Sequence, residues 1–163
     1  MGLRSMAEIE LSYKREVIQE LFDEYTSMLA KMNPEIYKCL QVQEYDAELE
    51  HLEEKYGVPA GRLYIAKDNG EKAGCIGFHR LSDENCEMKR LYVRSEFRGK
   101  GIANQLIRKV ICEARKQGYK AMLLDTLPSL QSAVKLYEKH GFYEVPPYYN
   151  NPIKSTIYMK LDL

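Results

Sequence analysis

Residues 85–117 read NCEMKRLYV RSEF RGKGIA NQLIRKVICEARKQ, and this stretch decides the fold. Its first part ends in the apolar run Leu91-Tyr92-Val93, whose β-branched and aromatic residues are typical of a strand. Its last part carries apolar residues at the spacing of one helix face, from Ile102 to Ala114. Gly118 follows at the position where a glycine commonly ends a helix. The stretch therefore predicts a strand, a loop and a helix.

The loop between this strand and this helix has the composition of an anion-binding site. It holds two glycines and three basic residues, Arg94, Arg98 and Lys100. Backbone N–H groups at a helix start have no partner inside the helix, and the helix dipole adds positive potential there. Because glycine lets a ligand come close to such a backbone, the loop predicts a phosphate site.

Two well-known phosphate-binding motifs fit this loop poorly. A P-loop requires Ser or Thr after its Gly-Lys pair to hold magnesium, but Gly101 follows Lys100 here. A Rossmann dinucleotide site finds support in Asp125, which ends the next expected strand. Against it, Asn104 stands where that motif places a third small residue, and the preceding strand carries charged side chains instead of being apolar throughout. We therefore set both motifs aside.

Two segments of the chain resemble the GNAT N-acetyltransferases. The first, Arg98-x-x-Gly101-x-Ala103, is similar to the family's loop for the pyrophosphate of acyl-CoA, which follows the pattern Gln/Arg-x-x-Gly-x-Gly/Ala. The second, Ala133-Val134-Lys135-Leu136-Tyr137-Glu138-Lys139-His140-Gly141-Phe142, is similar to the family's A-x-x-L-Y-x-K-x-G-F segment. The two segments stand in the family's order around a strand of fitting length. One departure is Leu130, because many members have Asn seven residues before the helix tyrosine.

The resemblance implies that acetyl-CoA is the cosubstrate and assigns residues to it. The backbone of Leu91, Tyr92 and Val93 would bind the pantetheine arm, in a central strand that opens away from the next strand. The Val93 N–H would then stabilise the oxyanion of the tetrahedral intermediate. The pyrophosphate would lie on the loop and helix start, formed by Arg98, Gly99, Lys100, Gly101, Ile102 and Ala103. The chain's three histidines are scattered, so no metal is expected.

The resemblance also implies direct transfer of the acetyl group to an amine in a ternary complex, with two candidate catalytic residues. Tyr137 is the candidate acid for the CoA thiolate, because a phenol keeps its proton near neutral pH. The alternative is that Tyr137 is a core residue. Glu87 is the candidate base, since its spacing before Arg98 matches the strand glutamate of some members, and we expect it to share a sheet face with Lys89 and Leu91. The alternative is a surface carboxylate paired with neighbouring cations, with a water relay as the base.

Composition and charge limit the classes of function. The chain's 163 residues suffice for one domain with a core, and 24 basic and 24 acidic residues give a net charge of zero. This balance argues against nucleic acid as the main partner. No apolar run approaches the roughly 20 residues that cross a bilayer, and none follows the first residues as in a signal peptide. The cysteines form no Cys-x-x-Cys pair. We therefore expect a cytoplasmic protein with reduced thiols and no membrane partner.

The remaining pattern predicts further helices and strands. Periodicity predicts a first helix capped by Ser12 and a second, acidic helix over residues 43–55. We interpret the acidic helix as solvated, with an acidic rim for a cationic substrate as the alternative. Asn69-Gly70 predicts a tight hairpin, and Gly74 and Gly77 predict a bulge or a close approach of two backbones. Other strands are expected over 62–67, 72–80, 119–124, 142–145 and 155–161, and another helix from Pro128 to His140.

These elements predict an α/β (α+β) fold. We expect a single GNAT-like domain over residues 1–163, with a mixed central sheet of about six to seven strands and helices on both faces. Residues 1–12 are expected to form a flexible start with a short leading strand.

The acceptor is expected to be an amine on a small molecule or a peptide. Tyr148 and Tyr149, in a loop rich in prolines and aromatic rings, are the candidates for binding it. A homodimer stays open. Two other classes of function also stay open: a non-catalytic CoA-binding or sensing module, and an anion-binding protein. The latter would use the basic residues Arg90, Arg94, Arg98, Lys100 and Arg108.

Overall fold

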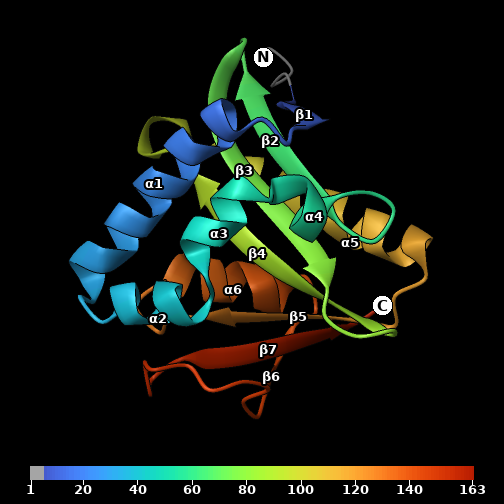
Figure 1. Cartoon of the computed structure of the whole chain (residues 1–163). Helices are drawn as coiled ribbons and strands as arrows, with labels where there is room; N and C mark the ends of the chain where they lie inside the picture. The colour runs from blue at the N-terminus through green and yellow to red at the C-terminus, as the bar shows by residue number, and fades with distance from the viewer. Residues whose placement is uncertain (1–5) are drawn as a thin grey trace.

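The structure, a computed structural model, describes residues 6–163 and contains one seven-stranded sheet (Figure 1). The strand order is β1-β2-β3-β4-β5-β7-β6, with β4 and β5 parallel and all other neighbours antiparallel. The leading strand expected within residues 1–12 is present as β1, whereas the flexible start falls on residues outside those described. The strands are β1 (Glu8–Leu11), β2 (Arg62–Asp68), β3 (Glu71–Arg80), β4 (Asn85–Val93), β5 (Ala121–Thr126), β6 (Tyr143–Val145) and β7 (Ile157–Asp162).

Helices cover both faces of this sheet (Figure 1). On one face lie α1 (Arg15–Met32), α2 (Ile36–Val42), α3 (Tyr45–Glu50) and α4 (Leu52–Tyr56). On the other face lie α5 (Ile102–Gln117) and α6 (Gln131–Lys139), and the 3-10 turn η1 (Ser95–Phe97) precedes α5. The apolar stripe of α5 and Tyr137 of α6 share one core cluster, while Ile18, Leu21 and Phe22 of α1 belong to a second. The predicted fold class is therefore confirmed.

The N-terminal helices differ from the sequence prediction. Helix α1 begins at Arg15 with Lys14 at its N-cap, so Ser12 does not cap it. The single acidic helix expected over residues 43–55 is wrong, because the chain forms two short helices there, α3 and α4, after α2 has ended at Val42. Glu44 has a left-handed backbone between α2 and α3, at φ 55°, and His51, at φ −130° and ψ 46°, separates α3 from α4. The expectation of a solvated face also fails at one position, where α3 turns the carboxylate of Glu48 into the protein interior.

The β2–β3 hairpin forms as predicted. Its turn has positive φ at both central residues, Asn69 (φ 50°) and Gly70 (φ 80°), which matches the right-handed twist of the flanking strands. Gly74 allows the close backbone approach that was expected there, since a Cβ would lie 2.4 Å from the carbonyl oxygen of Tyr92. The hairpin thereby brings β3 tightly against β4.

Strand β4 contains a bulge in its middle. Cys75 pairs with Tyr92 and Gly77 pairs with Lys89, so the two residues Arg90 and Leu91 face one residue of β3. Arg90 has φ 62°, which is uncommon for a residue other than glycine. The bulge breaks the simple alternation of side chains that the sequence predicted. Leu91 packs against the core cluster that contains the apolar stripe of α5, so it does not share a sheet face with Glu87 and Lys89.

Beyond this bulge, β4 and β5 separate. Their parallel pairing covers three residue pairs, from Asn85–Ala121 to Glu87–Leu123, and then ends. The opening of the central strand that the resemblance implied is thus present. Helix α5 begins after Gly101 and ends at Gly118, both with left-handed backbones, as predicted for Gly118. Helix α6 starts at Gln131, three residues later than Pro128.

Candidate active site

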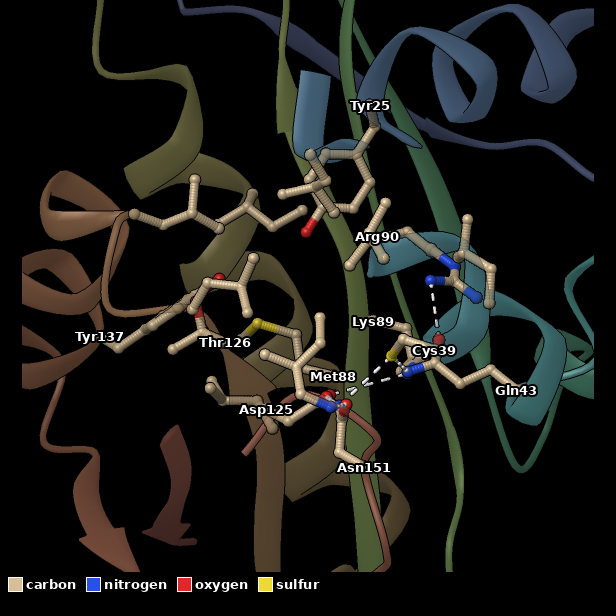
Figure 2. Close-up of a pocket in the computed structure, with 18 residues that line it drawn as sticks. Tyr25, Cys39, Gln43, Met88, Lys89, Arg90, Asp125, Thr126, Tyr137 and Asn151 are labelled. Atoms are coloured by element: carbon tan, nitrogen blue, oxygen red, sulfur yellow. Dashed lines mark hydrogen bonds and ion pairs between the residues drawn. The ribbon is translucent and has the colours of Figure 1, made fainter. Parts of the chain in front are cut away.

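Two cavities meet where β4 and β5 separate. The outer groove has a volume of about 460 Å³ and runs between β4, the loop before α5, and α6; the inner cavity has a volume of about 60 Å³ (Figure 2). Four side chains line both of them: Tyr25, Leu91, Leu130 and Tyr137. The remaining lining of the inner cavity comes from α1, α2, β4, β5, the loop before β7, and Gln43 and Leu127, which follow α2 and β5. Its polar members are Cys39, Gln43, Lys89, Arg90, Asp125, Thr126 and Asn151.

The loop predicted to bind pyrophosphate contributes in part to the outer groove. Arg98, Gly99 and Ala103 line it. The Nε of Arg98 donates to the carbonyl oxygen of Val93 at 3.0 Å, which fixes the loop against the end of β4. Lys100 and Gly101 do not line the groove, and the ammonium of Lys100 pairs with Asp68 at 3.0 Å.

The start of α5 is open at its N-cap. Gly101 is the N-cap at φ 80° and ψ 13°, and a Cβ placed there would meet no atom within 4 Å. The first amides of a helix have no partner inside it, so they are available to an anion. Ile102, in contrast, turns into the core and is 3% exposed, so its side chain serves packing while its backbone belongs to the helix start.

The other predicted cofactor residues come from the free end of β4. Leu91, Tyr92 and Val93 line the outer groove, beyond the last residue of β4 that pairs with β5. Glu24 of α1 fixes this segment through side-chain contacts. The hydroxyl of Tyr92 donates to Glu24 at 3.2 Å, and Arg94 binds the same carboxylate through two of its nitrogens. The end of β4 is therefore held in place while it faces the groove.

Tyr137 stands at the junction of the two cavities. It is 7% exposed and packs edge-on against Phe142 at 5.8 Å between ring centroids. Burial, with a smaller effect of Tyr25 and Asp125, raises the pKa of Tyr137 well above its usual range. Its hydroxyl makes no hydrogen bond to any residue in 6–163. The phenol is therefore protonated near neutral pH and free to donate to a ligand.

Tyr25 of α1 is a second phenol at this junction, and sequence reasoning missed it. It lines both cavities, and Figure 2 shows its hydroxyl directed into the inner one. Although its ring is partly exposed along the groove, burial of its hydroxyl end raises its pKa to about 12. In the sequence Tyr25 lies on the apolar stripe of α1, where a tyrosine is indistinguishable from a core residue.

Glu87 does not lie in either cavity. Its carboxylate is buried, 2.8 Å from Nε2 of His79, and accepts a hydrogen bond from the hydroxyl of Tyr148. Burial alone would raise the pKa of Glu87. The hydrogen bond with His79 and the charge of Lys89 outweigh burial and lower the pKa to about 2. A carboxylate with so low a pKa and no free path to the cavity is a weak base for an acceptor amine.

Tyr148 and Tyr149 also do not line the inner cavity. The hydroxyl of Tyr149 donates to Asp125 at 2.6 Å and accepts from Asn151 at 2.9 Å. The loop reaches the cavity through Asn151 and Ile153 instead. The asparagines of this loop follow no pattern that predicts a binding role, whereas adjacent aromatic rings are typical of one. The two tyrosines therefore position Glu87 and Asp125 in this structure.

Several of the basic residues considered for anion binding are neutralised within the protein. Arg90 forms a bidentate pair with Glu48, at 3.0 and 3.1 Å, and Arg94 binds Glu24. Burial would raise the pKa of Glu48, but Arg90 outweighs it and lowers the pKa to about 2. Lys55 binds the same carboxylate at 2.6 Å. The outer groove thus keeps Arg98 as its exposed cation.

Residues 6–163 contain neither a membrane-crossing helix nor a cluster of metal ligands. No helix in this range is long and apolar enough to cross a membrane. The same residues contain no group of three His, Cys, Asp or Glu side chains placed to hold a metal ion.

Comparison with known proteins adds a family to this geometry. A model described as the acetyltransferase (GNAT) family matches residues 16–142. The chain is 39% identical over 143 residues to an uncharacterized N-acetyltransferase of Schizosaccharomyces pombe, which covers 86% of this chain and 88% of the relative. An acetyltransferase of Streptococcus agalactiae shares the fold, with a TM-score of 0.75, 20% identity, and coverage of 98% of this chain and 99% of that chain.

A further solved structure carries a ligand. It is a GNAT family acetyltransferase of Elizabethkingia anophelis with acetyl-CoA bound, 30% identical, with a TM-score of 0.55 and coverage of 64% of this chain and 77% of that chain. The family model spans most of this chain and includes both sequence motifs, which end at Phe142. The chain therefore belongs to the GNAT acetyltransferase family, as its two motifs predict, and is an N-acetyltransferase by class.

Proposed function

We propose that this protein transfers the acetyl group of acetyl-CoA to an amine by direct attack in a ternary complex. One observation carries the proposal: the outer groove and the inner cavity share Tyr25, Leu91, Leu130 and Tyr137 as lining residues. A cosubstrate in the groove and an acceptor in the cavity would therefore meet at one point. Acetyl-CoA is the ligand of the Elizabethkingia anophelis relative, which supports it as the cosubstrate here.

The cosubstrate would lie along the outer groove. Its pyrophosphate would meet the amides at the start of α5 together with Arg98, where the helix dipole favours negative charge. Its pantetheine arm would pair with the backbone of Leu91, Tyr92 and Val93, since β4 has no strand partner on that side beyond Glu87. Leu130 stands where many relatives have Asn, and its apolar side chain would contact the arm without a hydrogen bond.

The chemistry requires an oxyanion donor and an acid. In the proposed reaction the acceptor nitrogen bonds to the thioester carbon, and the Val93 N–H stabilises the oxyanion that forms. The carbon–sulfur bond then breaks, and Tyr137 gives its proton to the thiolate. The phenol suits this role because its raised pKa keeps the proton in place near neutral pH and its hydroxyl has no protein partner in 6–163.

The amine must lose a proton before it attacks. The sequence predicts Glu87 as the base, and this role stays a proposal. Its burial and its bonds to His79 and Tyr148 argue against it. A water relay from the inner cavity needs no carboxylate in contact with the amine. Asp125 lines that cavity and is the carboxylate closest to such a path.

An acceptor screen tests the proposed function. Purified protein with acetyl-CoA and a panel of primary amines should release CoA thiol and yield acetylated amine, detected by mass, without a metal. Binding of acetyl-CoA with no turnover of any amine would instead support a sensing module, and failure to bind acetyl-CoA would contradict the proposal as a whole. A cytoplasmic location also stays a proposal, which imaging of the tagged protein would check.

A further inference from the structure

Lys89 carries a buried charge that the protein does not satisfy. Its side chain is 6% exposed and lines the inner cavity. Its one ion pair in 6–163 is with Asp125, whose Oδ1 lies 3.8 Å from the ammonium, too far for a hydrogen bond. An ammonium has three N–H donors, and burying it without acceptors is costly. The cavity therefore holds a cation whose donors await a ligand or water.

The other charged groups around Lys89 are already engaged. Arg90 uses its guanidinium on Glu48 and Gln43, and the cation at Lys55 also goes to Glu48. Oδ2 of Asp125 accepts hydrogen bonds from Tyr149 and Asn151. Lys89 differs from these neighbours because its ammonium makes no hydrogen bond to any of the described residues. An anion bound in this cavity would accept the hydrogen bonds that the Lys89 ammonium can donate.

The bulge in β4 gives Lys89 its place. Lys89 is the last residue before the two that oppose a single residue of β3, and Arg90 has φ 62°. Arg90 then anchors the bulge to α3 through Glu48. Lys89 is thereby fixed beside the opening between β4 and β5, and Figure 2 shows it across the cavity from Tyr137. A cation in this position faces the acceptor, on the opposite side from the proposed acid.

We propose that Lys89 binds a carboxylate of the acceptor, so that the substrate is a small zwitterionic amine such as an amino acid. The proposal rests on the proposed acetyl transfer. Asp125 gives the same cavity a negative group for the acceptor's ammonium, so a molecule with both charges matches the cavity better than one with either charge alone. The inner cavity of about 60 Å³ is well below the roughly 150 Å³ of a cavity that holds benzene, so it would take the carboxylate end of the acceptor while the rest of the molecule lies at its opening.

Matched pairs of acceptors test this inference. Each pair consists of an amino acid and an analogue that lacks its carboxylate: alanine with alaninamide, and 4-aminobutyrate with butylamine. With the wild-type protein, kcat/KM should be about 10- to 100-fold higher for the acid of at least one pair, the range expected for a charge-assisted hydrogen bond. In Lys89→Met the preference should vanish through a higher KM for the acid, while the rate with the analogue changes little. Lys89→Arg should restore part of the preference.

Two further measurements keep the result decisive. Lys120→Met removes an exposed lysine paired with Glu84 and should leave every rate unchanged. Calorimetric titration of alanine and acetate into the CoA-loaded protein needs no turnover, and binding that Lys89→Met abolishes would support the carboxylate site. Acetylation of acids and analogues at equal rates would overturn the inference but leave the proposed transfer intact. Loss of both rates to the same extent in Lys89→Met would also overturn it, as would the absence of both turnover and carboxylate binding.

Discussion

Tyr137 and Tyr25 both place a phenol at the junction of the two cavities. Replacing each in turn by Phe tests which of the two is the acid. Tyr137→Phe removes the hydroxyl and keeps the ring against Phe142. Because the hydroxyl has no protein partner in 6–163, folding should hardly change. General acid catalysis is typically worth about 100- to 10,000-fold, so kcat should fall by that order while acetyl-CoA binding stays normal. Steady-state rates beside thermal melts check this.

The matched variant is Tyr25→Phe. If Tyr137 is the acid, Tyr25→Phe should slow the reaction by less than tenfold, measured under conditions in which chemistry limits the rate. A large loss in Tyr25→Phe with near wild-type turnover in Tyr137→Phe would move the acid from α6 to α1. A lower melting temperature and unchanged turnover in Tyr137→Phe would make it a core residue.

Glu87 gives a prediction about pH. Its folded pKa of about 2 lies below the roughly 4.3 of an unfolded glutamate, so its stabilising effect is present above about pH 4 and is lost as the pH falls toward 2. Glu87→Gln should therefore lower stability at neutral pH and flatten its loss in acid, measured by denaturant unfolding. The acidic limb of the pH–rate profile should stay where it is in wild type. A shift of that limb would restore Glu87 as the base.

At this scale the sequence predicted the motif residues and missed the side chains that complete the cavity. Tyr137 and Arg98 were identifiable because they belong to ordered motifs. Tyr25 and Asn151 were not, since one lies on an apolar stripe and the other in an irregular loop. The pairing of Glu87 with Tyr148 joins residues far apart in the chain, and local patterns carry no information about such contacts.

Among the elements, the bulged strand β4 depends on α3. Arg90 adopts φ 62° while its guanidinium binds Glu48 and lies over the rings of Phe22 and Tyr45. Conformations of this kind persist when surrounding contacts hold them, and they gather at functional sites. The contact between α3 and β4 therefore fixes the segment from Lys89 to Val93, which serves both cavities.

Glu48→Gln tests this contact. Removing one partner of a buried ion pair typically costs about 3–5 kcal/mol, because the other charge stays buried. The variant should unfold at lower denaturant and should also bind acetyl-CoA more weakly, since β4 loses its anchor. Glu50→Gln, an exposed change in the same helix, should shift the free energy of unfolding by less than about 0.5 kcal/mol. Equal stability of the two variants would show that the pair does not hold the bulge.

The same contact explains why the acidic helix was predicted wrongly. Residues 43–55 have the charge and periodicity of one solvated helix, yet Glu48 finds its partner 42 positions away in β4. That partner turns the carboxylate inward, and the non-helical backbone of His51 divides the run into α3 and α4. Local propensity could not predict this break, whereas the hairpin at Asn69-Gly70 was predictable because its turn chemistry is local.

For the whole molecule, local sequence signals were sufficient to predict the architecture. The strand–loop–helix stretch and the second motif, residues 133–142, indicate β4, α5 and α6, and the remaining elements follow from hairpin and helix signals. The order β1-β2-β3-β4-β5-β7-β6 places the separation of β4 and β5 at the centre of the sheet. What the sequence could not predict is the lining of the inner cavity, because that lining comes from five different elements and three of the segments that connect them.

Calorimetric titration of acetyl-CoA into Gly101→Glu tests the central claim most directly. The substitution adds bulk and a negative charge at the N-cap of α5, where the pyrophosphate is proposed to bind. Gly70→Glu is its matched control, since Gly70 also has φ 80° with no atom within 4 Å of an added Cβ, and it lies in the β2–β3 turn. We expect acetyl-CoA binding to be lost in folded Gly101→Glu and kept in Gly70→Glu. Wild-type affinity in Gly101→Glu would contradict the account.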